Sequence, residues 1–197
     1  MSKPQQTPLP NSLPRNLTMD KLIILSGEAC TGKTTVGRAL AAELGYAFLS
    51  AGNHARAFAR ERYQLDVHAF QDLCAVDPEI DRQLDEAFRQ DIQANLNRGL
   101  GMVVDFRMGA HFFPAAMSIY LKASPAVVIR RLVGRKDEAF AQLLERNVKA
   151  RRRLLAIYRY DYAVEANYRH VIDTDELTAV QVVEQILTRF GRHGRGA

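Results

Sequence analysis

Residues 27–34 carry the densest set of groups suited to phosphate chemistry. Their sequence, Gly-Glu-Ala-Cys-Thr-Gly-Lys-Thr, fits the phosphate-binding loop pattern G-x-x-x-x-G-K-[ST]. Glycines let the backbone approach phosphates, and successive N–H groups with the following helix N-terminus supply positive potential. We expect Lys33 to contact the terminal phosphates of ATP and the Thr34 hydroxyl to bind Mg²⁺. The residues predicted to contact the nucleotide are Gly27, Cys30, Thr31, Gly32, Lys33, Thr34 and Thr35.

The segments on either side of this loop are those that a phosphate-binding loop needs. Residues 21–26 form a short apolar run, which is typical of a buried parallel strand. From residue 34 to residue 44, apolar side chains recur at helical spacing. The sequence therefore places the loop between a strand and a helix.

The chain as a whole is long enough for one well-packed domain. It has 197 residues, of which 47% are hydrophobic and 25% charged, as in ordinary globular proteins. Residues 1–18 hold four of the seven prolines and lack the features of a signal peptide, so we expect a disordered extension, with Met19 as the start of the functional part. We predict a domain over 19–190, a basic tail over 191–197, and no membrane span.

The chain has two cysteines, Cys30 in the loop and Cys74 in an expected helix, without metal-ligand spacing. This usage favours a reducing, cytoplasmic location. The positive potential of the loop can lower the pKa of the Cys30 thiol and make it reactive. The alternative is that Cys30 is simply a small residue that fits a tight loop.

Positive charge is concentrated in the second half of the chain. The net charge is +5, and arginines cluster at 130–131, 146–153 and 189–195. These clusters lack the interleaved aromatic residues of a base-stacking surface, so nucleic acid is not the expected partner. Arginines near a phosphate loop are also what a phosphoryl-transfer enzyme requires.

The order of expected elements indicates an α/β fold. Further strands are predicted at 46–50, 102–106, 117–121 and 170–173, and residues 51–53 read as a turn after the first of these. Helices are predicted at 54–63, 67–75, 77–96, 125–132 and 178–190, and 138–158 is highly charged. Strands separated by helices imply a parallel sheet covered on both faces.

Two stretches have the character of modules that a small kinase needs. The helical stretch 52–97, inserted between two strands, is the natural acceptor-binding insert. The arginine-rich stretch from residue 131 to about 160 is the natural lid over the transferring phosphoryl group.

The chain from residue 21 to residue 190 resembles the short, archaeal-type cytidylate kinases of the nucleoside monophosphate kinase family. The matching segments are 48–52 with Arg56, 77–82 with Asp85, 103–105 with Arg107, 121–123 with Pro125, Arg131 and Arg135, 146–153, and Ile157, Tyr158 and Asp161. The resemblance implies a P-loop three-layer fold with a five-stranded parallel sheet. It also implies transfer of the γ-phosphoryl group of ATP to a monophosphate such as CMP or dCMP.

The resemblance also implies roles for particular residues. Arg56 and Arg107, with Gly52, would hold the acceptor phosphate, and Arg131, Arg146 and Arg153 would be lid or hinge arginines. Lys33, Arg107, Arg146 and Arg153 are the predicted catalytic set. Asp105, at the end of a strand, would help Thr34 hold Mg²⁺ through water and border the acceptor. Asp81 and Asp85, one helical turn apart, would read the acceptor base or orient Arg56.

Several positions depart from the family pattern and leave the acceptor open. They are Glu28 and Cys30 in the loop, Asn53, and the segments 108–113 and 159–161. One alternative is a small-metabolite kinase with an alcohol acceptor, which would not need a pair of arginines for an acceptor phosphate. Another is a nucleotide- or RNA-binding regulator without turnover, which the basic tail would favour. The sequence does not give the oligomeric state.

Overall fold

The computed structural model describes residues 20–132 and 140–193. The predicted extension 1–18, the part of the lid at 133–139 that includes Arg135, and the end of the basic tail at 194–197 lie outside the described residues. Within the described ranges, no helix combines the length and the apolar character that crossing a membrane requires.

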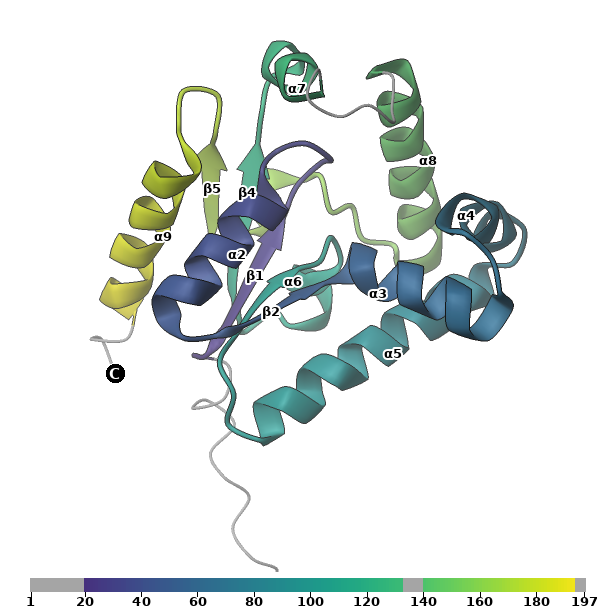
Figure 1. The fold of residues 1–197 in the computed structure, drawn as a ribbon, viewed down its shortest axis with the longest axis horizontal. Helices are drawn as coiled ribbons and strands as arrows, with labels where there is room; N and C mark the ends of the chain where they lie inside the picture. Colours follow the sequence, from purple (N-terminus) through teal and green to yellow (C-terminus); the bar gives the residue numbers. More distant parts are fainter. Residues whose placement is uncertain (1–19, 133–139, 194–197) are drawn as a thin grey trace, which may run out of the picture.

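Strands and helices alternate along most of the chain (Figure 1). The strands are β1 (Leu22–Ser26), β2 (Ala47–Ser50), β3 (Met102–Asp105), β4 (Met117–Lys122) and β5 (His170–Asp173). The helices are α2 (Lys33–Leu44), α3 (Ala51–Phe58), α4 (Val67–Val76), α5 (Pro78–Asn97), α6 (Gly109–Phe112), α7 (Pro125–Leu132), α8 (Phe140–Tyr158) and α9 (Ala179–His193). A π-helical turn η1 (Ala59–Tyr63) continues α3, and a 3₁₀ turn η2 (Glu165–Asn167) precedes β5.

The strands form one parallel sheet in the order β2-β3-β1-β4-β5. This confirms the predicted five-stranded parallel sheet. The central strand β1 is buried along its whole length, as its continuous apolar sequence requires. Because β1 lies between β3 and β4, the loop that follows β1 leaves the sheet beside the end of β3.

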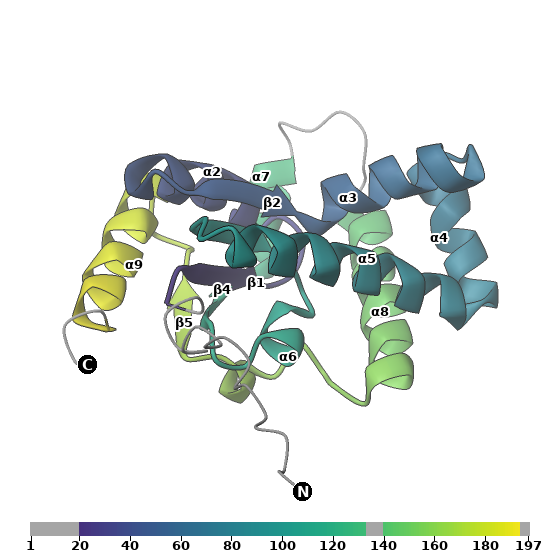
Figure 2. The ribbon, with the colours of Figure 1, turned by 90° about the horizontal axis from the view of Figure 1, so that it is seen from below.

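Helices cover both faces of the sheet (Figure 2). Alternate residues of β1 point to opposite faces, so Ile23 and Leu25 pack with residues of α2 and α9, whereas Leu22 and Ile24 pack with residues of α5 and α8. The result is the predicted three-layer α/β arrangement. Its two cores fix β1 and β3, and therefore the loops at their ends, from both sides.

The segment between β2 and β3 is helical and lies to one side of the sheet (Figure 1). It has a small core of its own, built from Phe58, Phe70, Cys74 and Ile80. Helix α5, predicted over 77–96, has a capped start, because Asp77 accepts a 3.0 Å hydrogen bond from the N–H of Glu79 and Pro78 opens the helix.

The turn predicted at residues 51–53 is wrong, because α3 begins directly at Ala51. Ser50 is extended and serves as the N-cap, so the strand passes into the helix without a separate turn. Gly52 and Asn53 lie in the first helical turn, where backbone N–H groups need no intrahelical partner and such residues are tolerated.

Candidate active site

The phosphate-binding loop is held in a conformation that depends on its glycines. Gly27 has φ 136°, and a Cβ atom there would lie 2.2 Å from the carbonyl oxygen of Leu121. Gly32, the N-cap of α2, has φ 95°. Cys30 also adopts a positive φ, 65°, which is uncommon for a residue with a side chain. The backbone is therefore fitted closely against the end of β4.

Side-chain hydrogen bonds also stabilise this loop. The hydroxyl of Thr31 donates to the carbonyl oxygen of Glu28 at 2.9 Å, and Nζ of Lys33 donates to the same oxygen at 2.6 Å. Arg131 donates to the carbonyl oxygen of Cys30 at 3.3 Å and to that of Thr174 at 2.7 Å. Arg131, predicted as a lid or hinge arginine, thus links the loop to the segment after β5.

Lys33 lies among charged groups at the carboxyl edge of the sheet. Burial lowers the pKa of Lys33 to about 8, Asp105 acts to raise it, and Arg107 acts to lower it further. A bound phosphate would favour the charged form of Lys33, because an anion supplies the solvation that burial removes. The structure thus brings Lys33, Asp105 and Arg107 of the predicted site together.

The Thr34 hydroxyl and the Asp105 carboxylate lie next to each other at the edge of the sheet. The Thr34 hydroxyl donates a 3.1 Å hydrogen bond to Oδ2 of Asp105, which joins the start of α2 to the end of β3. A hydroxyl beside a carboxylate matches the oxygen ligands that Mg²⁺ prefers when it binds with nucleotide phosphates. The two residues therefore fit the predicted metal role. Thr35, the next residue of α2, is exposed.

Arg107 lies between the loop and α8. Its Nη2 atom donates a 2.8 Å hydrogen bond to Oδ1 of Asn147 and lies 3.7 Å from Oε2 of Glu28. Its guanidinium carbon lies 5.2 Å from the ring centre of Tyr162, a cation–π distance. Arg107, which was predicted to hold an acceptor phosphate, thus lies beside the phosphate-binding loop.

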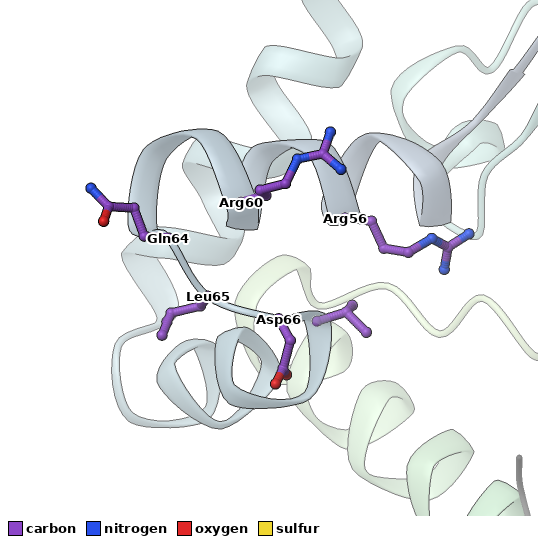
Figure 3. A pocket seen from close by; sticks show the side chains of 6 residues that line it. Arg56, Arg60, Gln64, Leu65 and Asp66 are labelled. Atoms are coloured by element: carbon purple, nitrogen blue, oxygen red, sulfur yellow. The ribbon is translucent and has the colours of Figure 1, made fainter.

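Arg56 lies at the start of the helical insert. Its Nη2 atom donates a 2.5 Å hydrogen bond to Oδ1 of Asn53, and a Cβ atom on Gly52 would be 3.9 Å from its guanidinium. Arg56 also lines an open groove of about 610 Å³ between α3 and α4, with Arg60, Gln64, Leu65, Asp66 and Val67. Gln64 and Leu65 line the opposite end of the groove from Arg56, and in Figure 3 the Arg56 guanidinium points away from them. Gly52 therefore lies beside the Arg56 guanidinium, and a Cβ atom there would make only an ordinary contact with it.

Asp81 and Asp85 lie in a buried cluster between α5 and α8. Only 4% of Asp81 and 9% of Asp85 is exposed. Arg153 forms an ion pair with Asp81, and the Tyr158 hydroxyl donates to Oδ2 of Asp85 at 2.9 Å. Burial raises the pKa of both carboxyl groups, that of Asp85 to about 7. In this structure Arg153 joins α8 to α5.

The described part of the predicted lid is α8 and the segment after it. Arg146 is half-buried and directly precedes Asn147, the partner of Arg107. Arg151 holds Asp161 through two hydrogen bonds, of 2.8 and 2.5 Å. The arginines of this helix therefore face different neighbours.

Sequence reasoning missed three residues of this site, namely Glu28 as a partner of Arg107, Asn147 and Tyr162. Asn147 lies within the matching segment 146–153 but carries no charge, and Tyr162 lies just after the segments considered. The importance of both depends on contacts with residues far away in sequence. Glu28 departs from the family pattern, which marks the loop as unusual, but the partners of its carboxylate could not be predicted from residue spacing.

The chain is similar in sequence and in fold to several known proteins. The AAA domain family model matches residues 23–153. The chain is 32% identical over 168 residues to a cytidylate kinase of Pyrobaculum arsenaticum, covering 82% of this chain and 88% of the relative. It is 38% identical over 176 residues to an S-adenosylmethionine-dependent nucleotide dehydratase of Lacinutrix mariniflava. That match covers 87% of this chain but spans only 36% of the dehydratase.

A shikimate kinase of Bacteroides thetaiotaomicron has a similar fold, with a TM-score of 0.57 and 17% identity over 86% of this chain and 98% of that one. Fold and loop thus define a P-loop protein with a three-layer α/β fold. The sequence relatives narrow the class further, and the chain belongs to the cytidylate kinase-like family of P-loop proteins.

Proposed function

We propose that this protein transfers the γ-phosphoryl group of ATP to a nucleoside monophosphate, with CMP and dCMP as the first acceptors to test. The observation that carries the proposal is the position of Arg107. It lies at the end of β3 within the electrostatic reach of Lys33, and it is hydrogen-bonded to Asn147 of α8. A cation in this position can hold a second phosphate next to the one that Lys33 holds.

In the proposed reaction, Lys33 and the loop N–H groups bind the phosphates of ATP, while Arg56 and Arg107 bind the acceptor phosphate in line. Thr34 and Asp105 would hold Mg²⁺, which neutralises charge on the phosphates when bound. Arg146 and Arg153 would add positive charge around the transferring group. For Arg153 this requires release from Asp81, its partner in this structure. An acceptor phosphate oxygen attacks the γ-phosphorus, and ADP leaves.

The test is ADP release in the presence of ATP and Mg²⁺ with CMP, dCMP, UMP, AMP and shikimate, and with no acceptor. Selective turnover of one or two monophosphates is expected, and Lys33→Ala should abolish it. Replacing Arg56 or Arg107 by Met should raise the KM for the acceptor more than the KM for ATP. Turnover of shikimate alone, or full activity of Lys33→Ala, would contradict the proposal.

The resemblance to a nucleotide dehydratase supports a narrower proposal about the acceptor. The matched segment makes up about a third of the dehydratase, so that protein combines a unit similar to the present chain with a larger remaining part. We infer that the acceptor of the present protein is a nucleotide of the kind that such a dehydratase releases. Comparison of kcat/KM for CMP with that for a monophosphate that has lost water would test this, and preference for CMP would count against it.

A further inference from the structure

The loop carries a negative charge where it is expected to bind negative phosphates. Glu28, the second residue of the phosphate-binding loop, extends its carboxylate toward Arg107, with Oε2 3.7 Å from Nη2. The Tyr162 hydroxyl lies 3.2 and 3.3 Å from the two carboxylate oxygens and donates to them. Glu28 is thus built into the same cluster as the arginine proposed to bind the acceptor.

The geometry shows which group fixes Glu28. Tyr162 is fully buried, and its hydroxyl holds the carboxylate within hydrogen-bonding distance. The distance from Glu28 to Arg107 is longer than a hydrogen bond, so this pair is held by charge alone. Nη2 of Arg107 donates instead to Asn147. Tyr162 and Asn147 therefore hold the two charged groups side by side without joining them tightly.

The Glu28 carboxylate pairs only loosely with Arg107, and it resembles an acceptor phosphate in carrying negative charge. Both side chains remain partly accessible, with 24% of Arg107 and 30% of Glu28 exposed, so an anion from solution can reach the pair. We propose that Glu28 is an internal competitor of the acceptor phosphate, pairing with Arg107 while the site is empty and yielding it when a monophosphate binds. This inference rests on the proposed function in one respect, that the acceptor carries a phosphate.

Competition of this kind makes acceptor binding depend on the negative charge of the acceptor. A singly charged acceptor gains little by replacing a carboxylate that is already in place. A phosphate monoester with two negative charges gains more, and Arg56 can hold it at the same time. Glu28 therefore disfavours carboxylate-bearing acceptors and raises the acceptor concentration at which the enzyme becomes saturated.

The test is Glu28→Gln in the full chain, because glutamine keeps the shape and can still accept from Tyr162 but carries no charge. The KM for the acceptor monophosphate should fall about fivefold, the size of effect that a partly exposed charge pair gives. The KM for ATP should change less than the KM for the acceptor, although the charge of Glu28 also acts on Lys33. In an Arg107→Met background the same substitution should leave the acceptor KM within twofold, since Glu28 acts through Arg107. Glu28→Ala serves as the second variant if Glu28→Gln does not fold.

Glu43→Gln is the matched control. Glu43 is exposed near the end of α2, outside the predicted acceptor-binding insert, so its replacement removes the same charge away from the site and should not change the acceptor KM. An acceptor KM that stays equal or rises in Glu28→Gln would overturn the inference. So would an equal fall in the Arg107→Met background, since it would mean that the charge of Glu28 acts without Arg107.

Failure of the proposed function can be told apart from failure of this inference. If the wild-type protein turns over no monophosphate, the proposed function fails. Calorimetric titration with inorganic phosphate then tests Glu28 without any turnover. About fivefold tighter binding by Glu28→Gln than by wild type is expected, and equal affinity would overturn the inference.

Discussion

Nη2 of Arg107 donates a 2.8 Å hydrogen bond to Oδ1 of Asn147, and this contact joins the end of β3 to α8 across 40 residues of sequence. Asn147 is buried, so its amide has few alternatives to this partner. The hydrogen bond to a charged donor is of the stronger kind. It ties the position of the proposed acceptor-binding arginine to the position of the lid helix.

Replacement of Asn147 by Ala should therefore weaken acceptor binding. We expect about a tenfold rise in acceptor KM, the effect of losing one hydrogen bond to a charged group, and little change in the KM for ATP. Steady-state kinetics with each substrate varied in turn checks this. Asn95→Ala is the control, because Asn95 donates only to a main-chain oxygen on the surface of α5. Equal acceptor KM values for Asn147→Ala and wild type would argue against the role.

The buried carboxyl group of Asp85 should make stability depend on pH. Its pKa in the folded protein is about 7, raised by burial, whereas an unfolded aspartate titrates near 4. The folded state thus binds more protons between these values, and the contribution of Asp85 to stability falls as pH rises from about 4 to 7. Asp85→Asn should remove this slope and give the more stable protein at pH 8, by a few kcal/mol.

Urea unfolding at pH 5 and pH 8 measures that effect. The Asn side chain can still accept from Tyr158, so the hydrogen bond is kept. Asp72→Asn is a suitable control because Asp72 is exposed on α4. If wild type and Asp85→Asn showed the same difference between the two pH values, Asp85 would not carry the buried proton.

Arg153 should contribute to stability through Asp81, whatever it does in catalysis. Arg153→Met leaves the Asp81 carboxylate buried without its cation, which costs about 3 kcal/mol of unfolding free energy. Adding Asp81→Asn should restore most of this loss, because no unpaired charge then remains. Chemical denaturation of the two variants checks the pattern. If the double variant is as unstable as Arg153→Met, the ion pair is not the cause.

Lys33 should respond to pH in the opposite direction from Asp85. Burial lowers its pKa to about 8 in the folded protein, so above that pH the folded state binds fewer protons than the unfolded chain. Its contribution to stability therefore rises with pH from about 8 toward the ordinary lysine value near 10.4. ATP affinity should fall over the same range, as Lys33 loses its charge. Calorimetric ATP binding at pH 7 and pH 9 tests this, and equal affinities would contradict it.

Much of the fold could be predicted from the sequence because its signals are local. The apolar runs of β1 and β3 and the Asp77-Pro78 start of α5 depend only on neighbouring residues. The strand order could not be predicted from such signals. The turn at residues 51–53 was misread, because glycine and asparagine suit both a turn and the first turn of a helix.

The candidate site was predictable only where a motif marks it. Lys33 and Thr34 follow from the loop pattern, and Asp105 and Arg107 from a strand end in a recognisable family context. Asn147 and Tyr162 lie between β4 and β5 in the sequence, far from Arg107, and only the folded structure brings them to it. The pairing of Asp81 with Arg153 likewise requires two helices to pack together.

The small core that α3, η1 and α4 form with the first turns of α5 has an evolutionary consequence. Phe58 and Phe70 pack within this unit, whereas the residues that support the phosphate loop belong to the two cores around β1. Substitutions around Arg56 can therefore accumulate without disturbing the loop that would bind ATP. If the proposed function holds, a lineage with this architecture can exchange one acceptor for another while its donor chemistry stays constant.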